Sequence, residues 1–129
     1  FVNVYDELIG KTIVSFEYDS DEYILLVLET GERYKMFHTQ NCCERVFIDD
    51  VIGDLNDLVG VPLLMAEEIY YNNEAPDGCL TPSDEDGYIS EGSFHWTFYK
   101  FATINGYVTI RWYGTSNGYY SESVDFKKV

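Results

Sequence analysis

The stretch "WTFYKFATINGYVTIRWYG", residues 96–114, consists of two runs of aromatic and β-branched residues around the pair Asn105-Gly106. Such side chains fit a pleated, half-buried surface, and Asn-Gly suits the two-residue turn of a type I′ hairpin. The stretch therefore predicts an antiparallel hairpin with strands near residues 94–103 and 106–113.

The same signals recur along the chain. Alternating or β-branched runs bounded by turn residues predict further strands near residues 12–18, 22–29, 32–38, 45–50, 63–70 and 118–126. Gly31 and the pair Asn117-Gly118 supply two more turns, so three antiparallel hairpins are expected. The predicted fold is mainly β, of the α+β class, with about eight antiparallel strands in one sheet system and two short helical turns.

The two helical turns are predicted at residues 5–10 and 54–60. Each opens at an Asp that can cap a helix and ends at a Gly that can take the left-handed conformation. They belong to similar segments, "ELIGKTIVSFE" at 7–17 and "DLVGVPLLMAE" at 57–67. Common turn chemistry produces such matches by chance, so either the likeness is accidental or the domain consists of two pseudo-repeated four-stranded units.

Length and composition predict a single domain over residues 1–129, with 46% hydrophobic residues to form a core. Residues 72–93 hold two of the three prolines and six acids, and are expected to form a long acidic surface loop. No apolar run is long enough to span a membrane, and the start lacks the features of a secretory leader. Three cysteines without framework spacing favour a reducing compartment, so a cytoplasmic location is predicted.

Charge is the strongest compositional feature. The chain has 23 acidic and 8 basic residues, a formal net charge of −15. Residues 1–91 hold 21 of the acids and four of the bases, so the negative field belongs to that part of the chain. Binding to phosphates needs Lys and Arg to displace counterions. Direct binding to nucleic acid or to an anionic membrane is therefore not expected.

The stretch "FHTQNCCERVF" places His38 four positions before the adjacent Cys42 and Cys43. Histidine and cysteine thiolate are zinc ligands, and a Cys beside a His can act as a nucleophile. A closed zinc site needs four ligands, however, and Cys79 and His95 would have to come from distant segments. No residue stands out as the group that would orient His38 as a base. The favoured interpretation makes the cysteines core residues in the bend that closes the first four-stranded unit, so no metal, cofactor or catalytic residue is predicted.

The C-terminal part is the most aromatic. Val108, Ile110 and Trp112 alternate with other residues and are expected to face the core. The opposite face would carry Tyr107, Arg111, Tyr113 and Tyr119. Tyrosine and arginine are favoured at protein interfaces, so these four are candidate partner-binding residues, unless a second sheet or a loop covers them. Acidic candidates for partner binding are Asp49, Asp50, Asp84, Glu85, Asp86 and Glu91.

The patterns "CCE-V-I-D", "GDL-DL-G-P" and "WTFYKFATI-GYVTIRWYG-SNGYYSESV" resemble a family of small acidic proteins from bacteriophages and their bacterial hosts that has no assigned function. The resemblance spans most of the chain and is most specific from Trp96 to Phe126. It implies a small phage or prophage protein in the host cytoplasm. It supplies no catalytic residues.

The predicted function is that of a non-enzymatic acidic phage protein that binds and inhibits a host protein. A surface at this charge can imitate the phosphates of DNA and occupy the basic channel of a nucleic-acid-binding defence factor, as an anti-CRISPR-like DNA mimic would. Self-association into a homodimer through the tyrosine and arginine face is a further possibility. The alternative is a small metal- or ligand-binding protein or enzyme that uses His38, Cys42 and Cys43.

Overall fold

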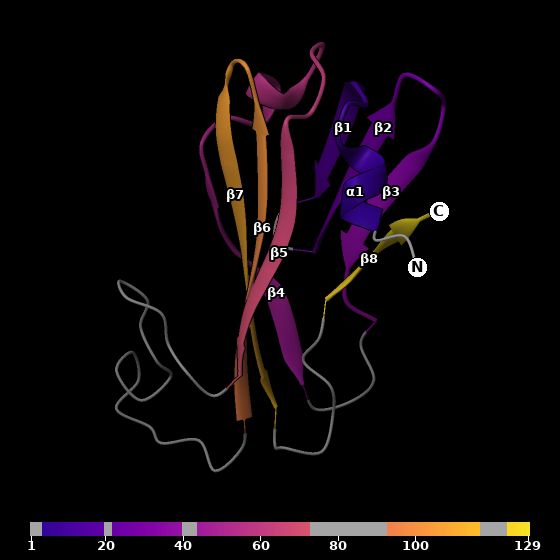
Figure 1. Ribbon diagram of the computed structural model, residues 1–129. Coiled ribbons are helices and arrows are strands. Elements are labelled where there is room, and N and C mark those ends of the chain that lie inside the picture. The colour runs from indigo at the N-terminus through magenta and orange to yellow at the C-terminus, as the bar shows by residue number, and fades with distance from the viewer. Residues whose placement is uncertain (1–3, 20–21, 40–43, 73–92, 117–123) are drawn as a thin grey trace.

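The computed structural model describes residues 4–19, 22–39, 44–72, 93–116 and 124–129. Within these ranges the chain forms eight strands, one short α-helix and one 3₁₀-helical turn (Figure 1). In chain order the elements are α1 (Val4–Leu8), β1 (Ile13–Asp19), β2 (Tyr23–Leu28), β3 (Arg33–Phe37), β4 (Arg45–Ile52), η1 (Leu55–Leu58), β5 (Met65–Asn72), β6 (Ser93–Thr103), β7 (Gly106–Ser116) and β8 (Asp125–Lys128). Neither described helix is long and apolar enough to cross a membrane.

The strands form two antiparallel sheets, with the orders β1-β2-β3-β8 and β4-β7-β6-β5 (Figure 1). The predicted mainly β, antiparallel fold is thus confirmed, with the difference that the strands divide between two sheets. Each sheet has an apolar inner face, and each covers the other. The core holds Trp112 from β7 and Met36 from β3, and the indole N–H of Trp112 donates to the Met36 sulfur across 3.4 Å.

The hairpin predicted around Asn105-Gly106 is confirmed, because β6 and β7 pair antiparallel from Thr103↔Gly106 outward. The hairpin at Gly31 is also confirmed, since β2 and β3 pair and Gly31 has a φ of +90°. The third predicted hairpin is wrong. β8 does not pair with β7 but with β3 of the other sheet. The Asn117-Gly118 turn lies outside the described residues.

The bend after His38 also behaves differently from its prediction. It does not close a first four-stranded unit, because β4 pairs with β7 in the second sheet. Ile48 of β4 lies beside Trp112 in the register and joins the core. An alternating pattern predicts which face of a strand is buried. Because several strands have the same pattern, it does not predict which strand will pair with which. The partner is therefore decided by the packing of the whole core.

The two similar segments occupy matching places in the structure. The N–H of Gly10 donates to the carbonyl of Leu63, and the N–H of Gly60 donates to the carbonyl of Ile13, both across 2.8 Å. Gly10 and Gly60 are 50 positions apart, as are Ile13 and Leu63, and the glycines have φ of +89° and +87°. Each half also builds three strands of one sheet and lends its fourth to the other. The halves thus form two pseudo-repeated units that exchange their last strands.

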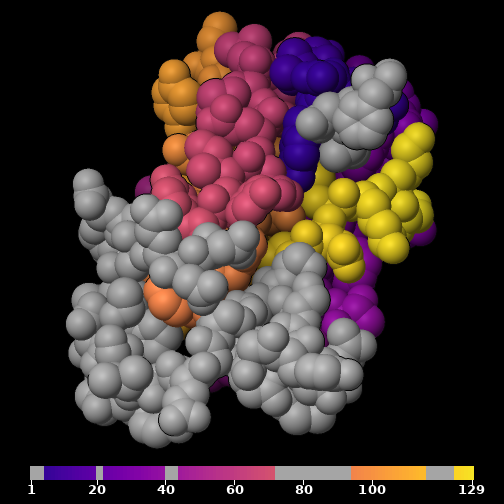
Figure 2. Space-filling view, turned by 60° about the horizontal axis from the view of Figure 1, so that its bottom comes forward, coloured from indigo at the N-terminus to yellow at the C-terminus, as the bar shows by residue number. Residues whose placement is uncertain are grey.

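The helical segments differ in detail from their predictions. Asp54 caps η1, since its carboxylate accepts from the N–H of Asn56 at 2.9 Å. Asp6, in contrast, lies in the first turn of α1 and does not precede it. The ring of Tyr5 in α1 stacks on Phe126 of β8 with the centroids 5.5 Å apart. Figure 2 shows α1 in indigo, β5 in rose and β8 in yellow meeting on one face.

Candidate functional site

The outer face of the second sheet is unusually aromatic. The residues of β7 that alternate with its core positions point outward, and their register partners on the neighbouring strands do the same. One row across the sheet reads Phe47, Tyr113, Trp96 and Tyr71, and Phe98 lies in the next row beside Arg111. We call these five aromatic residues, Phe47, Tyr71, Trp96, Phe98 and Tyr113, the aromatic face.

The middle of the aromatic face is closely packed. The ring centroids of Trp96 and Tyr113 are 4.4 Å apart, and Phe47 meets Tyr113 edge-on at 6.0 Å. The guanidinium of Arg111 lies 5.4 Å from the Trp96 ring centroid, and that of Arg45 lies 4.5 Å from the Phe47 centroid. Trp96 is 4% exposed and Tyr113 is 8% exposed. These contacts hold the face as a rigid, cation-edged surface.

A β-bulge brings two carboxylates to this face. The register of β4 and β7 shifts between Ile48 and Asp50, so Asp49 is the extra residue of the bulge. Nε of Arg111 donates to Oδ2 of Asp49 at 2.7 Å, and Asp50 lies 3.9 Å from the same guanidinium. The acidic pair predicted from sequence is thus joined to the predicted Tyr and Arg face, and Asp49 is largely neutralised by Arg111.

The other predicted partner-binding residues differ in position. Tyr107 stands at the start of β7, next to the hairpin turn, and is 74% exposed, whereas Tyr113 is buried. Asp84, Glu85, Asp86, Glu91 and Tyr119 fall outside the described residues. Sequence reasoning missed Phe47, Trp96 and Phe98 as outward residues, although the alternation within residues 94–103 carried the signal for the last two.

His38 has a partner that sequence reasoning did not find. Its Nε2 lies 3.0 Å from Oε2 of Glu44, and the two side chains are 6% and 0% exposed. A buried carboxylate is costly unless it is paired, so the contact orients the imidazole and balances the carboxylate. Glu44 directly precedes β4, and His38 directly follows β3, so the contact joins the ends of two strands that belong to different sheets.

A metal site is not formed by the described residues, among which no three His, Cys, Asp or Glu side chains cluster. The predicted alternative used Cys42 and Cys43, which lie outside the described ranges. His95 stacks on Tyr70 with ring centroids 5.4 Å apart. Among the described residues of this region, His38 and Glu44 are therefore the pair that could accept or transfer a proton.

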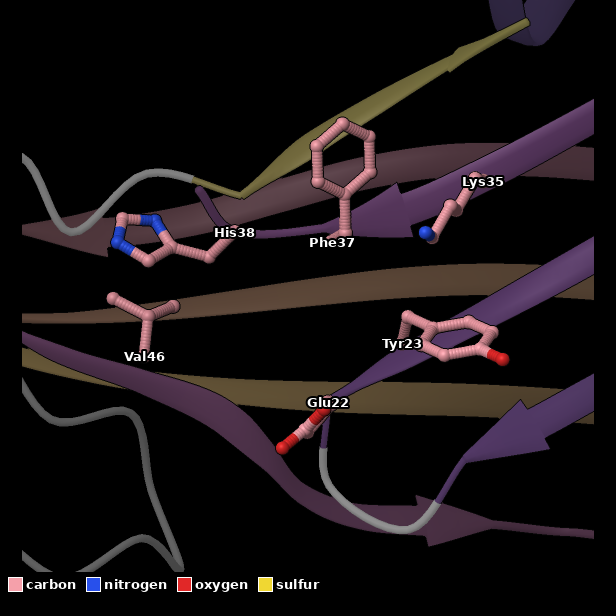
Figure 3. Close-up of a pocket in the computed structure, with 6 residues that line it drawn as sticks. All are labelled: Glu22, Tyr23, Lys35, Phe37, His38 and Val46. Carbon is pink, nitrogen blue, oxygen red and sulfur yellow. The ribbon is translucent and has the colours of Figure 1, made fainter. Parts of the chain in front are cut away.

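An open pocket of about 410 Å³ lies beside His38, and its lining residues are Glu22, Tyr23, Lys35, Phe37, His38 and Val46 (Figure 3). Nζ of Lys35 is 4.4 Å from the Tyr23 ring centroid and 5.2 Å from that of Phe37. The pocket sits where the chain crosses from the first sheet to the second. It combines a cation, two aromatic rings, an imidazole and a carboxylate.

A second hollow, of about 370 Å³, is lined by Tyr5, Asp6, Ala66, Glu67 and Glu68. The Tyr5 hydroxyl donates to Oε2 of Glu68 at 2.6 Å, and burial and this carboxylate raise the pKa of Tyr5 above its usual range. We call this hollow between α1 and β5 the acidic groove.

Ion pairs neutralise few of the acids. Glu32 contacts Lys11 at 3.1 Å and Lys128 at 2.7 Å, and hydrogen bonds from Lys128, Thr30 and Lys11 lower its pKa to about 2. Among the described residues the remaining ion pairs involve only Glu44, Asp49 and Asp50 as acids. The exposed acids without one include Asp6, Glu7, Glu17, Asp19, Glu29 and Glu67.

Comparison with known proteins identifies a family for the chain and does not identify an activity. No curated protein and no solved structure matches it. The family model described as "Domain of unknown function (DUF7448)" matches residues 6–126, which include the aromatic face, the pocket beside His38, the acidic groove except Tyr5, and both sheets except the last two residues of β8. The chain therefore belongs to the DUF7448 family.

Proposed function

We propose that this chain is a non-enzymatic acidic protein that binds a basic surface of a host protein and inhibits it. The acidic groove is the observation that carries the proposal. Three of its five lining residues, Asp6, Glu67 and Glu68, are carboxylates, and none of them forms an ion pair among the described residues. A Lys or Arg side chain of a partner fits such a groove in charge and in size.

The chain's own bases are used elsewhere, which supports this assignment. Lys11 and Lys128 contact Glu32, and Arg111 contacts Asp49. Lys35 and Lys127 lie near the Phe37 ring. Among the described residues no Lys or Arg forms an ion pair with the carboxylates on α1, β1 and β5, although Lys100 of β6 faces Glu67 in the register of β5 and β6.

A partner with a basic surface follows from the sign of this field. A net charge of −15 repels phosphate groups and attracts proteins that bind them, with electrostatically accelerated association. Occupation of a nucleic-acid channel by carboxylates would inhibit such a protein. The resemblance to phage proteins supports a cytoplasmic defence factor of the host as the target, in the manner of a DNA mimic or an anti-CRISPR protein.

Tyr107 and the arginines beside the aromatic face supply a candidate surface for further contact with this partner or with a second copy of the chain, whereas Trp96 and Tyr113 at the centre of the face are buried. The arginine edges and the exposed Tyr107 match the composition of protein interfaces. Size-exclusion chromatography with light scattering decides between these uses, because a dimer would occupy the face without a host protein.

The test begins with the immobilised protein in host lysate at low and high salt, followed by identification and purification of the captured protein. The purified partner is then titrated with the chain in competition with a labelled DNA duplex. Displacement of the duplex, with an apparent Kd that weakens steeply as salt increases, is expected. Capture that is insensitive to salt, or that leaves the duplex bound, would overturn the proposal.

The variant Asp6→Asn/Glu68→Gln removes two charges from the acidic groove. Glu17→Gln/Asp19→Asn is its matched control, because it removes the same charge from β1, away from the groove. The groove variant should weaken binding more than the control does. If both variants bind like the unaltered protein, the carboxylates are not the contact.

A further inference from the structure

Strands β3 and β8 of the first sheet carry more basic than acidic residues, although the chain as a whole is strongly acidic. Four of the eight Lys and Arg residues lie on β3 and β8, namely Arg33, Lys35, Lys127 and Lys128. Lys35 and Lys127 face each other directly in the register of these strands. Like charges in this arrangement repel each other. An anion bound between them would remove the repulsion.

The pocket next to Lys35 has the dimensions of a small-molecule site. Its volume of about 410 Å³ lies within the range of roughly 300–1,000 Å³ found for ligand pockets. Figure 3 shows the Lys35 ammonium between the rings of Tyr23 and Phe37, with His38 and Val46 across the opening and Glu22 at its side. One end is thus cationic and aromatic, and another offers hydrogen-bonding groups.

The wall formed by His38 is fixed in place. Glu44 is fully buried behind it and contacts Nε2 at 3.0 Å, so turning the imidazole would break a buried contact. Phe37 is likewise placed by its strand, and Nζ of Lys127 lies 5.5 Å from its ring centroid. A site whose walls are held before binding loses little conformational entropy when a ligand enters.

We propose that this pocket binds a small anion joined to a planar ring, the chemistry of a nucleoside monophosphate. The phosphate pairs with the Lys35 ammonium in the pocket, and Lys127, which faces Lys35 in the register and lies 5.5 Å from the Phe37 ring centroid, adds a second cation at its edge. The base packs against the half-buried aromatic rings of Tyr23 and Phe37. The Glu22 carboxylate accepts a hydrogen bond from an amino or imino group of the base. This site is independent of the acidic groove and of the proposed partner.

Isothermal titration calorimetry with AMP, GMP, CMP and UMP tests the proposal, with adenosine and inorganic phosphate as separate arms. At least one monophosphate should bind about tenfold or more tightly than either fragment, because only the intact nucleotide uses both ends of the pocket. Absence of binding by all four would overturn the proposal. Equal binding by adenosine would overturn the role of the cations, and equal binding by phosphate would overturn that of the rings.

Three variants localise the site. Lys35→Met and Lys127→Met should each weaken nucleotide binding about tenfold or more, whereas Lys100→Met, which removes a cation from β6 of the other sheet, should leave it unchanged. Circular dichroism checks that each variant folds, and the second lysine serves if the first variant does not. Nucleotide binding that survives in both folded pocket variants would refute the assignment.

Discussion

Replacement of Phe126 tests the exchange of the last strands between the two halves. Its ring contacts four aromatic rings, with centroid distances of 5.5 Å to Tyr5 and Tyr99, 6.0 Å to Tyr34 and 6.1 Å to Phe101. Tyr34 is the informative partner, because it lies on β3 and meets Phe126 only if β8 joins the first sheet.

The expected magnitude follows from burial. Phe126 is half-buried, so Phe126→Leu should lower the free energy of unfolding by about 1–2 kcal/mol, less than the loss at a fully buried site. Tyr34→Leu in the core should cost about 2–3 kcal/mol. Aromatic pairs contribute about 0.5–1.5 kcal/mol beyond buried area, so the double variant should lose that much less than the sum.

Urea unfolding followed by circular dichroism measures these values by linear extrapolation. Phe98→Leu combined with Phe126→Leu is the control pair, and its effects should add because Phe98 lies on the outer face of the other sheet. Additivity of Tyr34→Leu and Phe126→Leu within about 0.3 kcal/mol would show that the rings do not meet, and the strand exchange would be refuted.

Two further predictions concern carboxylates. Glu44→Gln should lower the free energy of unfolding by about 1–3 kcal/mol because it disrupts the buried contact between the Glu44 carboxylate and Nε2 of His38. Glu29→Gln at an exposed turn should change it by less than about 0.5 kcal/mol, and equal effects in urea unfolding would contradict the pairing. The pKa of Glu32 is lowered from 4.5 to about 2, so its stabilising contribution is present above about pH 4.5 and is lost as the pH falls toward 2. Glu32→Gln should therefore flatten the acid limb of the stability profile, and an unchanged limb would show that the lysine contacts do not persist in solution.

The two proposed binding sites differ in the sign of the charge that they offer to a ligand. The acidic groove lies between α1 and β5 and offers carboxylates to a basic protein. The pocket beside His38 holds Lys35 in a mainly acidic molecule and offers a local positive field to a small anion. Because the two sites share no residue, the fate of one proposal does not decide the other.

Much of the secondary structure was predictable because it depends on neighbouring residues. The Asn105-Gly106 turn and the alternation around it specify the β6–β7 hairpin. Likewise Gly10 and Gly60 mark equivalent turns, since both take a left-handed conformation. The likeness of residues 7–17 and 57–67 has a structural counterpart in the reciprocal hydrogen bonds between the two segments.

The candidate sites were harder to predict because their members come from different strands. Asp49 and Arg111 are 62 positions apart and meet through the register of β4 and β7 and a bulge within it. Lys35 and Lys127 meet because β8 crosses to the first sheet. No pattern within one strand predicts these pairs of residues, because they depend on which strands pair and in which register.

Local patterns in the sequence predicted the mainly β class and the central hairpin, and composition gave the strongly negative charge, whereas the likeness of the two halves could equally have been accidental. Tertiary structure alone decided that β4 and β8 exchange sheets, that Glu44 supports His38, and that a cationic, aromatic pocket forms at the crossing. The physical reason is that alternation of apolar and polar residues predicts which face of a strand is buried. Which strand pairs with it depends on how the whole core packs.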